Sequence, residues 1–406
     1  MKEKRNIRKY YLRYVLYYSA YVLITGGIVQ SFMMESGISA GQVAVYTSII
    51  QLVQAAAMLL AAPFVERSKN IIKMNAYAQY GLVPMFLAMF LLSLYPGFDP
   101  GVKYGIMVAA GVIGYVALAV IGIIEYKLPY LIIDIANYGE VVSIAGLCIG
   151  ISNLAVSSLF SFFIARFDYF KVVLVFVTVG LLFLIASVFV GRSYEDISKE
   201  PGISQFADKE QSEDAPKKKI DLFKYPPFLK LFVPNLLRGY ASGTFAIMTT
   251  VGYHFGIIDA KSASWMVILS NIVIMGGCVL YAKLSRLKKD GMLILVSSIG
   301  LLFCMPAMLI GKNTAVFLLF FAVGTLFKNI VDYACPVAIT YVIDYDIVGQ
   351  FSSWRISLYM LGAAIAGVVL MPMLDAIGGI PTMLINGAAF VIMGAGYWLC
   401  VKDKQK

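Results

Sequence analysis

Twelve long apolar runs, separated by short polar stretches, dominate the pattern of hydrophobic and polar positions along the chain. Each run reaches the length of about 20 residues that a helix needs to cross the hydrocarbon core of a bilayer. Six runs precede one long polar segment, at residues 12–34, 43–65, 74–95, 104–133, 144–166 and 170–191. Six more follow it, at residues 229–255, 264–284, 291–311, 314–343, 353–374 and 380–401. The pattern predicts an all-α polytopic membrane protein with twelve transmembrane helices in two six-helix pseudo-repeats.

The long polar segment divides the chain. It mixes acidic and basic residues between Arg192 and Lys224 and includes the basic run 217–219. This composition is typical of a solvated linker. We therefore expect an N-terminal six-helix bundle over residues 1–191, a cytoplasmic linker over 192–228 and a C-terminal six-helix bundle over 229–406.

Composition agrees with a protein that folds in lipid. Of the 406 residues, 60% are hydrophobic and 14% are charged, and the mean hydropathy is +0.81. A soluble chain of this length could not bury so much apolar surface. No two cysteines have the spacing of a metal or redox site, so we interpret all five as small core residues, namely Cys148, Cys278, Cys304, Cys335 and Cys400.

The positions of the basic residues predict the orientation of the chain. With the N-terminus in the cytoplasm, 24 of the 33 Lys and Arg residues fall on the cytoplasmic side of the twelve spans. Five fall outside, namely Lys103, Arg166, Lys171, Lys261 and Lys312, and four lie in or at the ends of spans. This bias follows the positive-inside rule and places both termini in the cytoplasm. The net charge of +10 therefore reflects topology, and we expect no nucleic-acid partner. The first run is too long for a signal peptide and counts as the first helix.

Landmarks recur in the two halves in the same order. The stretch Glu125-Tyr126-Lys127-Leu128-Pro129 corresponds to Asp332-Tyr333-Ala334-Cys335-Pro336 at an offset of 207 residues. Gly37-Ile38 corresponds to Gly256-Ile257 at an offset of 219, and the basic turns 66–69 and 285–288 share that offset. These matches indicate an internal duplication. Parallel six-helix repeats are an architecture of transporters, with the substrate between the repeats.

The two six-helix halves, the cytoplasmic linker and termini, and the short basic turns after the second and eighth runs resemble the major facilitator superfamily over the whole chain. The signature turn of that family is Gly-x-x-x-Asp-Arg-x-Gly-Arg-Lys. The corresponding residues 62–70 read Ala-Pro-Phe-Val-Glu-Arg-Ser-Lys-Asn, with the acid–arginine pair and one further base but neither glycine. The resemblance implies that the first, fourth, seventh and tenth helices line a central cavity.

Two shorter stretches resemble the glycoside–pentoside–hexuronide:cation symporters within this superfamily. They are Leu128-Pro129-Tyr130 and Val342-Ile343-Asp344-Tyr345-Asp346. The acidic second helix of that branch is missing, since residues 43–65 contain no Asp or Glu. The Gly-Pro motif found in the fifth helix of many drug exporters is missing as well.

Five charged residues on the cavity helices are candidates for coupling or gating: Glu125, Lys127, Arg238, Lys328 and Asp332. Charged side chains inside a membrane are costly unless they are paired or hydrated. Lys328 and Asp332 are four residues apart, so they face each other on one helix. Arg238 lies about 15 Å from the cytoplasmic end of its span, and we expect it to pair with Glu125 or Asp332. Three roles stay open for this cluster: a gate or structural lock, direct proton coupling, and substrate contact.

Five further polar residues are candidates for the substrate cavity: Tyr21, Gln30, Asn235, Tyr240 and His254. Tyrosine and glutamine side chains in a cavity suit a hydroxylated or aromatic substrate. His254 is the one histidine of the chain, and it is either a hydrogen-bonded interface residue or a proton relay. The spacings Gly239-x-x-x-Gly243 and Gly146-x-x-x-Gly150 indicate close helix packing.

The sequence contains no nucleotide-binding loop, no zinc-site spacing and no nucleophile elbow. We therefore expect neither an enzyme nor ATP-driven transport, and no cofactor or metal. The prediction is a secondary active transporter that moves a small polar, sugar-like organic solute across the cell membrane by alternating access. Symport with a proton or a sodium ion is the expected drive, and the partners are the substrate, this coupling ion and the lipid bilayer.

Two alternatives stay open. The first is efflux of amphipathic compounds or drugs. The second is a transport-inactive membrane sensor or scaffold, although a scaffold has no need for charges on the cavity helices. We expect a monomer for the main prediction and for both alternatives.

Overall fold

The computed structural model describes residues 2–68, 70–133, 135–197, 225–284, 287, 289–340, 342 and 348–402. Several predicted features lie outside these residues: most of the linker, most of the stretch 342–346, part of the turn 285–288, and the side chain of Lys127. The described part consists of helices and their connections, as predicted. The first half holds α1 (Lys2–Tyr21), α2 (Gly26–Glu35), α3 (Ala40–Arg67), α4 (Ile71–Gln79), α5 (Val83–Leu94), α6 (Pro100–Ile132), α7 (Ile135–Ile164) and α8 (Tyr169–Arg192). The second half holds α10 (Pro226–Ala246), α11 (Met248–His254), α12 (Ala260–Leu284), α13 (Asp290–Ala307), α14 (Thr314–Thr340), α15 (Val348–Ile377) and α16 (Gly379–Val401).

Eleven of the twelve predicted spans are confirmed as helical stretches long and apolar enough to cross a membrane, among the residues described. The remaining prediction, 229–255, corresponds to α10 and α11. It is divided into two helices at Ile247, and α10 contains the charged residues Lys230 and Arg238. Its polar residues Asn235, Arg238, Ser242 and Thr244 are buried, so protein covers them in place of lipid.

The first span of each half is broken near its middle. In the first half, α1 ends in the short 3-10 turn Val22–Ile24, and Thr25 has an extended backbone (φ −136°, ψ 165°) before α2 begins. In the second half, Ile247 (φ −101°, ψ 16°) separates α10 from α11. Non-helical backbone at membrane depth is tolerated where protein or a cavity surrounds it. The matching breaks extend the evidence for duplication beyond the residue patterns.

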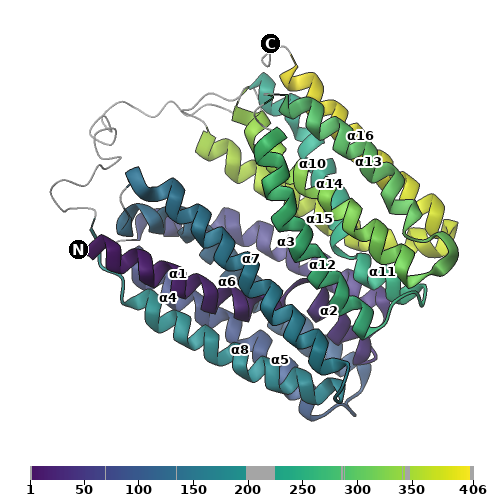
Figure 1. Ribbon diagram of the computed structural model, residues 1–406, viewed down its shortest axis with the longest axis horizontal. Helices are drawn as coiled ribbons and strands as arrows, with labels where there is room; N and C mark the ends of the chain where they lie inside the picture. Colours follow the sequence, from purple (N-terminus) through teal and green to yellow (C-terminus); the bar gives the residue numbers. More distant parts are fainter. Residues whose placement is uncertain are drawn as a thin grey trace.

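Each half has its own apolar core. One core of buried residues draws on α10 to α16, with Ala40 and Ala44 of α3 added to it. A second core draws on residues of α1 to α8 between Tyr17 and Leu184. A smaller third core lies around Tyr10, Ile132 and the segment after α8. Figure 1 shows the corresponding two bundles, the first in purple to teal and the second in green to yellow.

The two halves meet through α3 against α15, α7 against α12, and α2 against α11 and α12. The chain begins and ends at the same end of the bundles, and there the helix ends of the two halves are spread apart (Figure 1). The opposite end is closed by side chains. Gln30 donates to the carbonyl of Ala246 at 3.0 Å and accepts from Thr250 at 3.3 Å. Ser31 and Glu35 lie 2.9 Å and 3.2 Å from the hydroxyl of Tyr253.

Glycines allow the closest helix approaches, as the sequence predicted for one of the two spacings. A Cβ on Gly239 would lie 1.9 Å from the carbonyl oxygen of Tyr359, and one on Gly243 would lie 2.6 Å from the Cα of Ala363. The α10–α15 contact therefore requires these glycines. In the other spacing, Gly146 has nothing within 4 Å of a built Cβ, whereas a Cβ on Gly150 would lie 3.2 Å from Cγ of Met275 on α12. The prediction is therefore wrong for Gly146 and confirmed for Gly150.

Candidate functional site

Three cavities meet at Tyr21, at the break in the first span. The central cavity, of about 340 Å³, lies between the two halves. The Glu125 cavity, of about 290 Å³, lies within the first half between α1, α3 and α6. The Gln30 cavity, of about 250 Å³, lies around the helix break and reaches Gln30 and Gln51. Tyr21 lines all three, which makes it the best placed of the predicted cavity residues.

The central cavity is lined by polar groups from both halves. The first half contributes Tyr21, Thr25 and Asn153, and the second half contributes hydroxyl, amide and ammonium groups from α10, α12, α14 and α15. Three of the polar atoms have no hydrogen-bond partner within the protein: Oδ1 of Asn153, Oγ of Ser242 and Nδ2 of Asn329. Buried polar atoms are normally satisfied. Free donors and acceptors on a cavity wall are what a polar solute needs for recognition.

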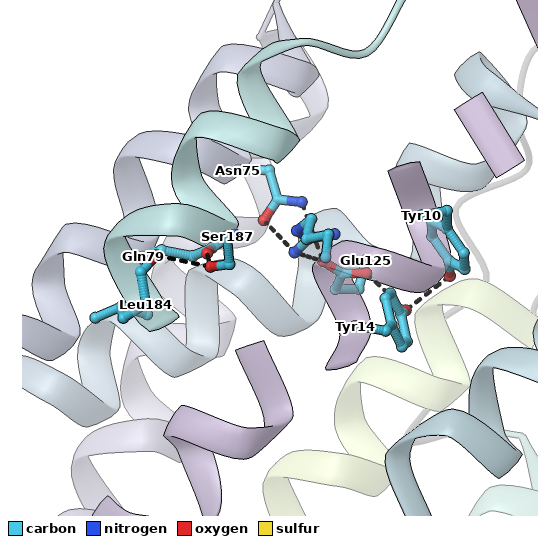
Figure 2. A network of polar contacts seen from close by, with 8 residues as sticks. Tyr10, Tyr14, Asn75, Gln79, Glu125, Leu184 and Ser187 are labelled. Carbon is cyan, nitrogen blue, oxygen red and sulfur yellow. Dashed lines mark hydrogen bonds and ion pairs between the residues drawn. The ribbon is translucent and has the colours of Figure 1, made fainter. Parts of the chain in front are cut away.

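A buried ion pair lies at the end of the Glu125 cavity. The guanidinium of Arg13 on α1 forms an ion pair with Glu125 on α6, and the Arg13 side chain is 1% exposed. Figure 2 shows the surrounding network. The hydroxyl of Tyr14 donates to Glu125 Oε2 at 2.8 Å, and the amide of Asn75 donates to Oε1 at 3.0 Å. With its amide turned by 180°, Gln79 accepts from Arg13 at 3.1 Å and 3.2 Å.

A second ion-pair cluster lies in the other half. Arg238 Nη2 on α10 donates to Asp332 Oδ1 on α14 at 2.9 Å, and Lys328 Nζ donates to Oδ2 at 2.6 Å. The guanidinium of Arg238 also lies over the ring of Tyr359, 5.2 Å from its centroid. The predicted pair of Lys328 and Asp332 is confirmed. Arg238 pairs with Asp332 and not with Glu125, because each carboxylate is satisfied within its own half.

The two ion-pair clusters have the same arrangement in the two halves. In each half an arginine on the first span pairs with the carboxylate of the repeated acid-Tyr-x-x-Pro stretch on the fourth span: Arg13 with Glu125, and Arg238 with Asp332. Arg13 was not among the predicted site residues, because it lies at the cytoplasmic end of the first apolar run and was counted with the 24 cytoplasmic Lys and Arg residues. An available signal was that Leu12-Arg13 and Leu237-Arg238 occupy similar places ahead of the two helix breaks.

The clusters differ in charge. The first has one cation and one carboxylate, so it is formally neutral. The second has two cations, Arg238 and Lys328, on the single carboxylate of Asp332. The residue at the offset of 207 from Lys328 is Ile121, so the first half has no counterpart of this lysine.

The remaining predicted cavity residues are distributed differently from expectation. Gln30 lines its cavity and joins the two halves. Asn235 is 2% exposed and donates to the carbonyl of Leu231 while it accepts from Tyr397 at 2.6 Å. Neither Asn235 nor Tyr240 is among the described residues that line the three cavities.

His254 lies at the closed end of the halves and not on a described cavity wall. Its Nε2 atom is 3.4 Å from Asp375 Oδ1, and the Asp375 side chain is 68% exposed. The imidazole also packs edge-on against Phe255, with ring centroids 4.9 Å apart. This placement favours the interpretation as an interface residue over that as a proton relay.

These features define the class of protein: a polytopic helical membrane protein with a polar cavity between two related halves. The comparison with family models gives the family. Residues 11–335 match the model of the Major Facilitator Superfamily. The chain therefore belongs to this superfamily and is a membrane transporter with its two-bundle fold.

Solved structures support the fold over nearly the full length. A D-xylose–proton symporter is 13% identical, with 98% of each chain covered and a TM-score of 0.69. The inward-open xylose transporter XylE from E. coli is 12% identical over 98% of this chain and 96% of that one, with a TM-score of 0.68. The nucleoside transporter NupG is 14% identical over 99% of this chain and 100% of that one, with a TM-score of 0.66. No curated protein matches the chain.

Proposed function

We propose that the protein is a secondary active transporter that moves a small, polar, hydroxylated solute across the cell membrane by alternating access. The observation that supports this most is the central cavity, because both halves line it and three of its polar atoms lack partners within the protein. Its volume of about 340 Å³ suits a small organic molecule. The xylose and nucleoside transporters that share the fold act on hydroxylated solutes, which agrees with this substrate class.

We further propose that residues 1–191 and 229–406 are the two moving units and that residues 192–228 link them. The distribution of Lys and Arg places both termini in the cytoplasm. The closed contacts of Gln30 and Tyr253 then lie on the outer side, and the spread helix ends lie on the cytoplasmic side. On this assignment the conformation is inward-open. Outward opening requires the contacts at Gln30 and Tyr253 to separate.

Glu125 is the proposed proton-coupling group. Its side chain is 21% exposed and lines a cavity that shares Tyr21 with the central one, which places Glu125 near the proposed substrate site. Loss of the charge on Glu125 leaves one cation unpaired, whereas loss of the charge on Asp332 leaves two. Protonation of Glu125 also releases Arg13, which changes the contact between α1 and α6. The cluster of Asp332 is then a structural lock between α10 and α14.

Counterflow in proteoliposomes tests the transport itself. Vesicles loaded with an unlabelled sugar, sugar acid or nucleoside are diluted into the labelled solute, and protein-dependent uptake is expected for at least one of them. Asn271→Trp, on the cavity wall of α12, should abolish this uptake. Val279→Trp on the same helix is the control, since Val279 is 61% exposed and is not among the described residues that line the central cavity. Equal uptake by the two variants excludes the central cavity as the route, and no uptake of any solute favours a sensor.

A further inference from the structure

The charge of the cluster around Asp332 constrains the solute. Each oxygen of the Asp332 carboxylate has a cationic partner: Oδ1 accepts from Arg238 at 2.9 Å and Oδ2 accepts from Lys328 at 2.6 Å. Two cations on one carboxylate leave a formal charge of +1. A net charge in a low-dielectric interior is costly, and a group of opposite charge stabilises it.

This excess charge borders the substrate site. Lys328 lines the central cavity, and it is the charged side chain among the described lining residues, while Arg238 and Asp332 are not on that wall. Its ammonium group has three hydrogen-bond donors, of which Asp332 takes one. Two donors of the Lys328 ammonium therefore remain. The Lys328 side chain is 20% exposed and lines the central cavity.

Two neighbouring donors lack partners. Asn329 follows Lys328 on α14, and its amide Nδ2 has no hydrogen-bond partner within the protein although the residue is 7% exposed. Ser242 on α10 is 2% exposed, and its hydroxyl is likewise unpartnered. Both residues line the same cavity as Lys328. A carboxylate is an acceptor-only group with two oxygens, so it can use one ammonium and two further donors together.

The duplication supports a separate role for Lys328. Arg13 and Arg238 both have the task of pairing the carboxylate of their own half. Lys328 adds a second cation to a carboxylate that already has one, and its counterpart in the first half is Ile121. Lys328 is therefore not needed for the arginine–carboxylate ion pair that both halves contain.

From these observations we infer that the solute is a hydroxylated monocarboxylate, such as a sugar acid, whose carboxylate binds Lys328, Asn329 and Ser242. This inference rests on the proposed transport function and narrows its substrate class. The unpartnered Oδ1 of Asn153, on the opposite wall, is an acceptor for a hydroxyl of the same solute.

Binding to the purified full-length protein tests the inference with matched pairs of probes. D-glucuronate and D-glucose differ only at C6, and the open-chain pair D-gluconate and D-sorbitol differ only at C1. Titration calorimetry and thermal shift should show at least one acid binding about ten- to a hundredfold more tightly than its neutral partner, because a hydrogen bond to a charged group is lost in the neutral sugar. Equal or tighter binding of the neutral sugars overturns the inference.

Two variants locate the effect. Lys328→Met keeps most of the length of the side chain without its charge and should remove the preference for the acid. Lys328→Arg keeps the charge and should retain most of the preference. An unchanged preference in Lys328→Met shows that another group binds the carboxylate and also overturns the inference. Because the comparison of acid with neutral sugar uses the unmodified protein, it stands even if a variant folds poorly.

Counterflow distinguishes this inference from the proposed function. Uptake of neutral sugars or nucleosides without uptake or binding of any monocarboxylate leaves transport established and the charge preference refuted. No counterflow of any acidic or neutral solute contradicts the proposed function and the inference together.

Discussion

Gly367→Ala is expected to weaken the closed end of the two halves selectively. Gly367 on α15 packs against α3 across the boundary between the halves. A Cβ built on it would lie 2.0 Å from Ser48 Oγ and 2.7 Å from the carbonyl oxygen of Ala44. The serine hydroxyl can rotate away, although it then gives up its hydrogen bond of 3.1 Å to Ala44. The backbone carbonyl cannot rotate, so α3 and α15 must separate.

The expected penalty is about 1–3 kcal/mol, the usual range for an added methyl group in a well-packed interface. Because α3 and α15 belong to different halves, the penalty applies to this conformation and is relieved when the ends separate. The ratio of closed to open populations at this end should therefore fall by roughly 5- to 150-fold. Ser48→Ala in the same protein removes the nearer clash and should restore part of the closed population.

Spin labels measure the effect directly. Gly97→Cys and Ile380→Cys, in a background without the five native cysteines, place one label on each half at the closed end, where both positions are exposed. Gly367→Ala should lengthen the distance distribution between the labels. The control is Gly276→Ala on α12, which has nothing within 4 Å of its built Cβ and should leave the distribution unchanged. A lower melting temperature with an unchanged distance distribution would refute the reasoning, because the contact would then be a static one.

Three further substitutions test other contacts of the structure. Asp332→Asn leaves two buried cations without a carboxylate and should lower the free energy of unfolding by about 3–5 kcal/mol. Chemical denaturation in detergent measures this loss. Adding Lys328→Met to the same protein should recover part of it. Gln30→Ala removes two hydrogen bonds between the halves at the closed end. It should increase the labelling of an outer-side cysteine by a membrane-impermeant maleimide. Labelling equal to that of the protein with Gln30 would contradict the role of Gln30 in closing this end. Burial opposes the charge of Asp259, but the N–H and hydroxyl of Ser262, each 2.8 Å from its carboxylate, more than offset this and lower its pKa. Its stabilisation of the start of α12 should therefore be fully present above about pH 4 and be lost progressively as the pH falls below that. Asp259→Ala should lower the melting temperature at pH 7 and lower it less at pH 3.

The spans and the pairing of the charged residues within them could be predicted, because both depend on the local sequence pattern and on depth in the membrane. Apolar runs of sufficient length predicted eleven spans that the structure confirms. The depth of Arg238 in its span predicted a carboxylate partner, and the four-residue spacing predicted the contact of Lys328 with Asp332. Such predictions depend on the geometry of a single helix or on the cost of an unpaired charge in lipid, and they do not require knowledge of how distant elements pack.

The choice of partner and the face of each helix could not be predicted. Arg13 lies at the end of its apolar run, where a long side chain can reach water, and it is buried because α4, α6 and α8 cover it. Asn235 and Ser242 lie on the same helix, yet Asn235 packs against Tyr397 on α16 and Ser242 faces the cavity. A sequence without aligned relatives gives the spacing of these residues but not the rotation of the helix that holds them.

The breaks at Thr25 and Ile247 were also missed, because both lie inside continuous apolar runs. Hydropathy responds to composition and is insensitive to whether the backbone stays helical. Gly26 and Gly27 follow the first break, but two adjacent glycines in an apolar run are equally compatible with close helix packing. Gly26 in fact adopts φ +59°, a left-handed conformation that favours glycine.

Uptake driven by a proton gradient, measured in proteoliposomes for a solute that shows counterflow, tests the central claim most directly. With the outside more acidic than the inside, the unmodified protein should accumulate the labelled solute above its external concentration. Glu125→Gln should exchange the solute across the membrane and fail to accumulate it. Glu195→Gln is the matched control, since Glu195 forms an exposed ion pair with Arg5 away from the cavities. Accumulation by Glu125→Gln equal to that of the control would contradict the assignment of Glu125 as the coupling group.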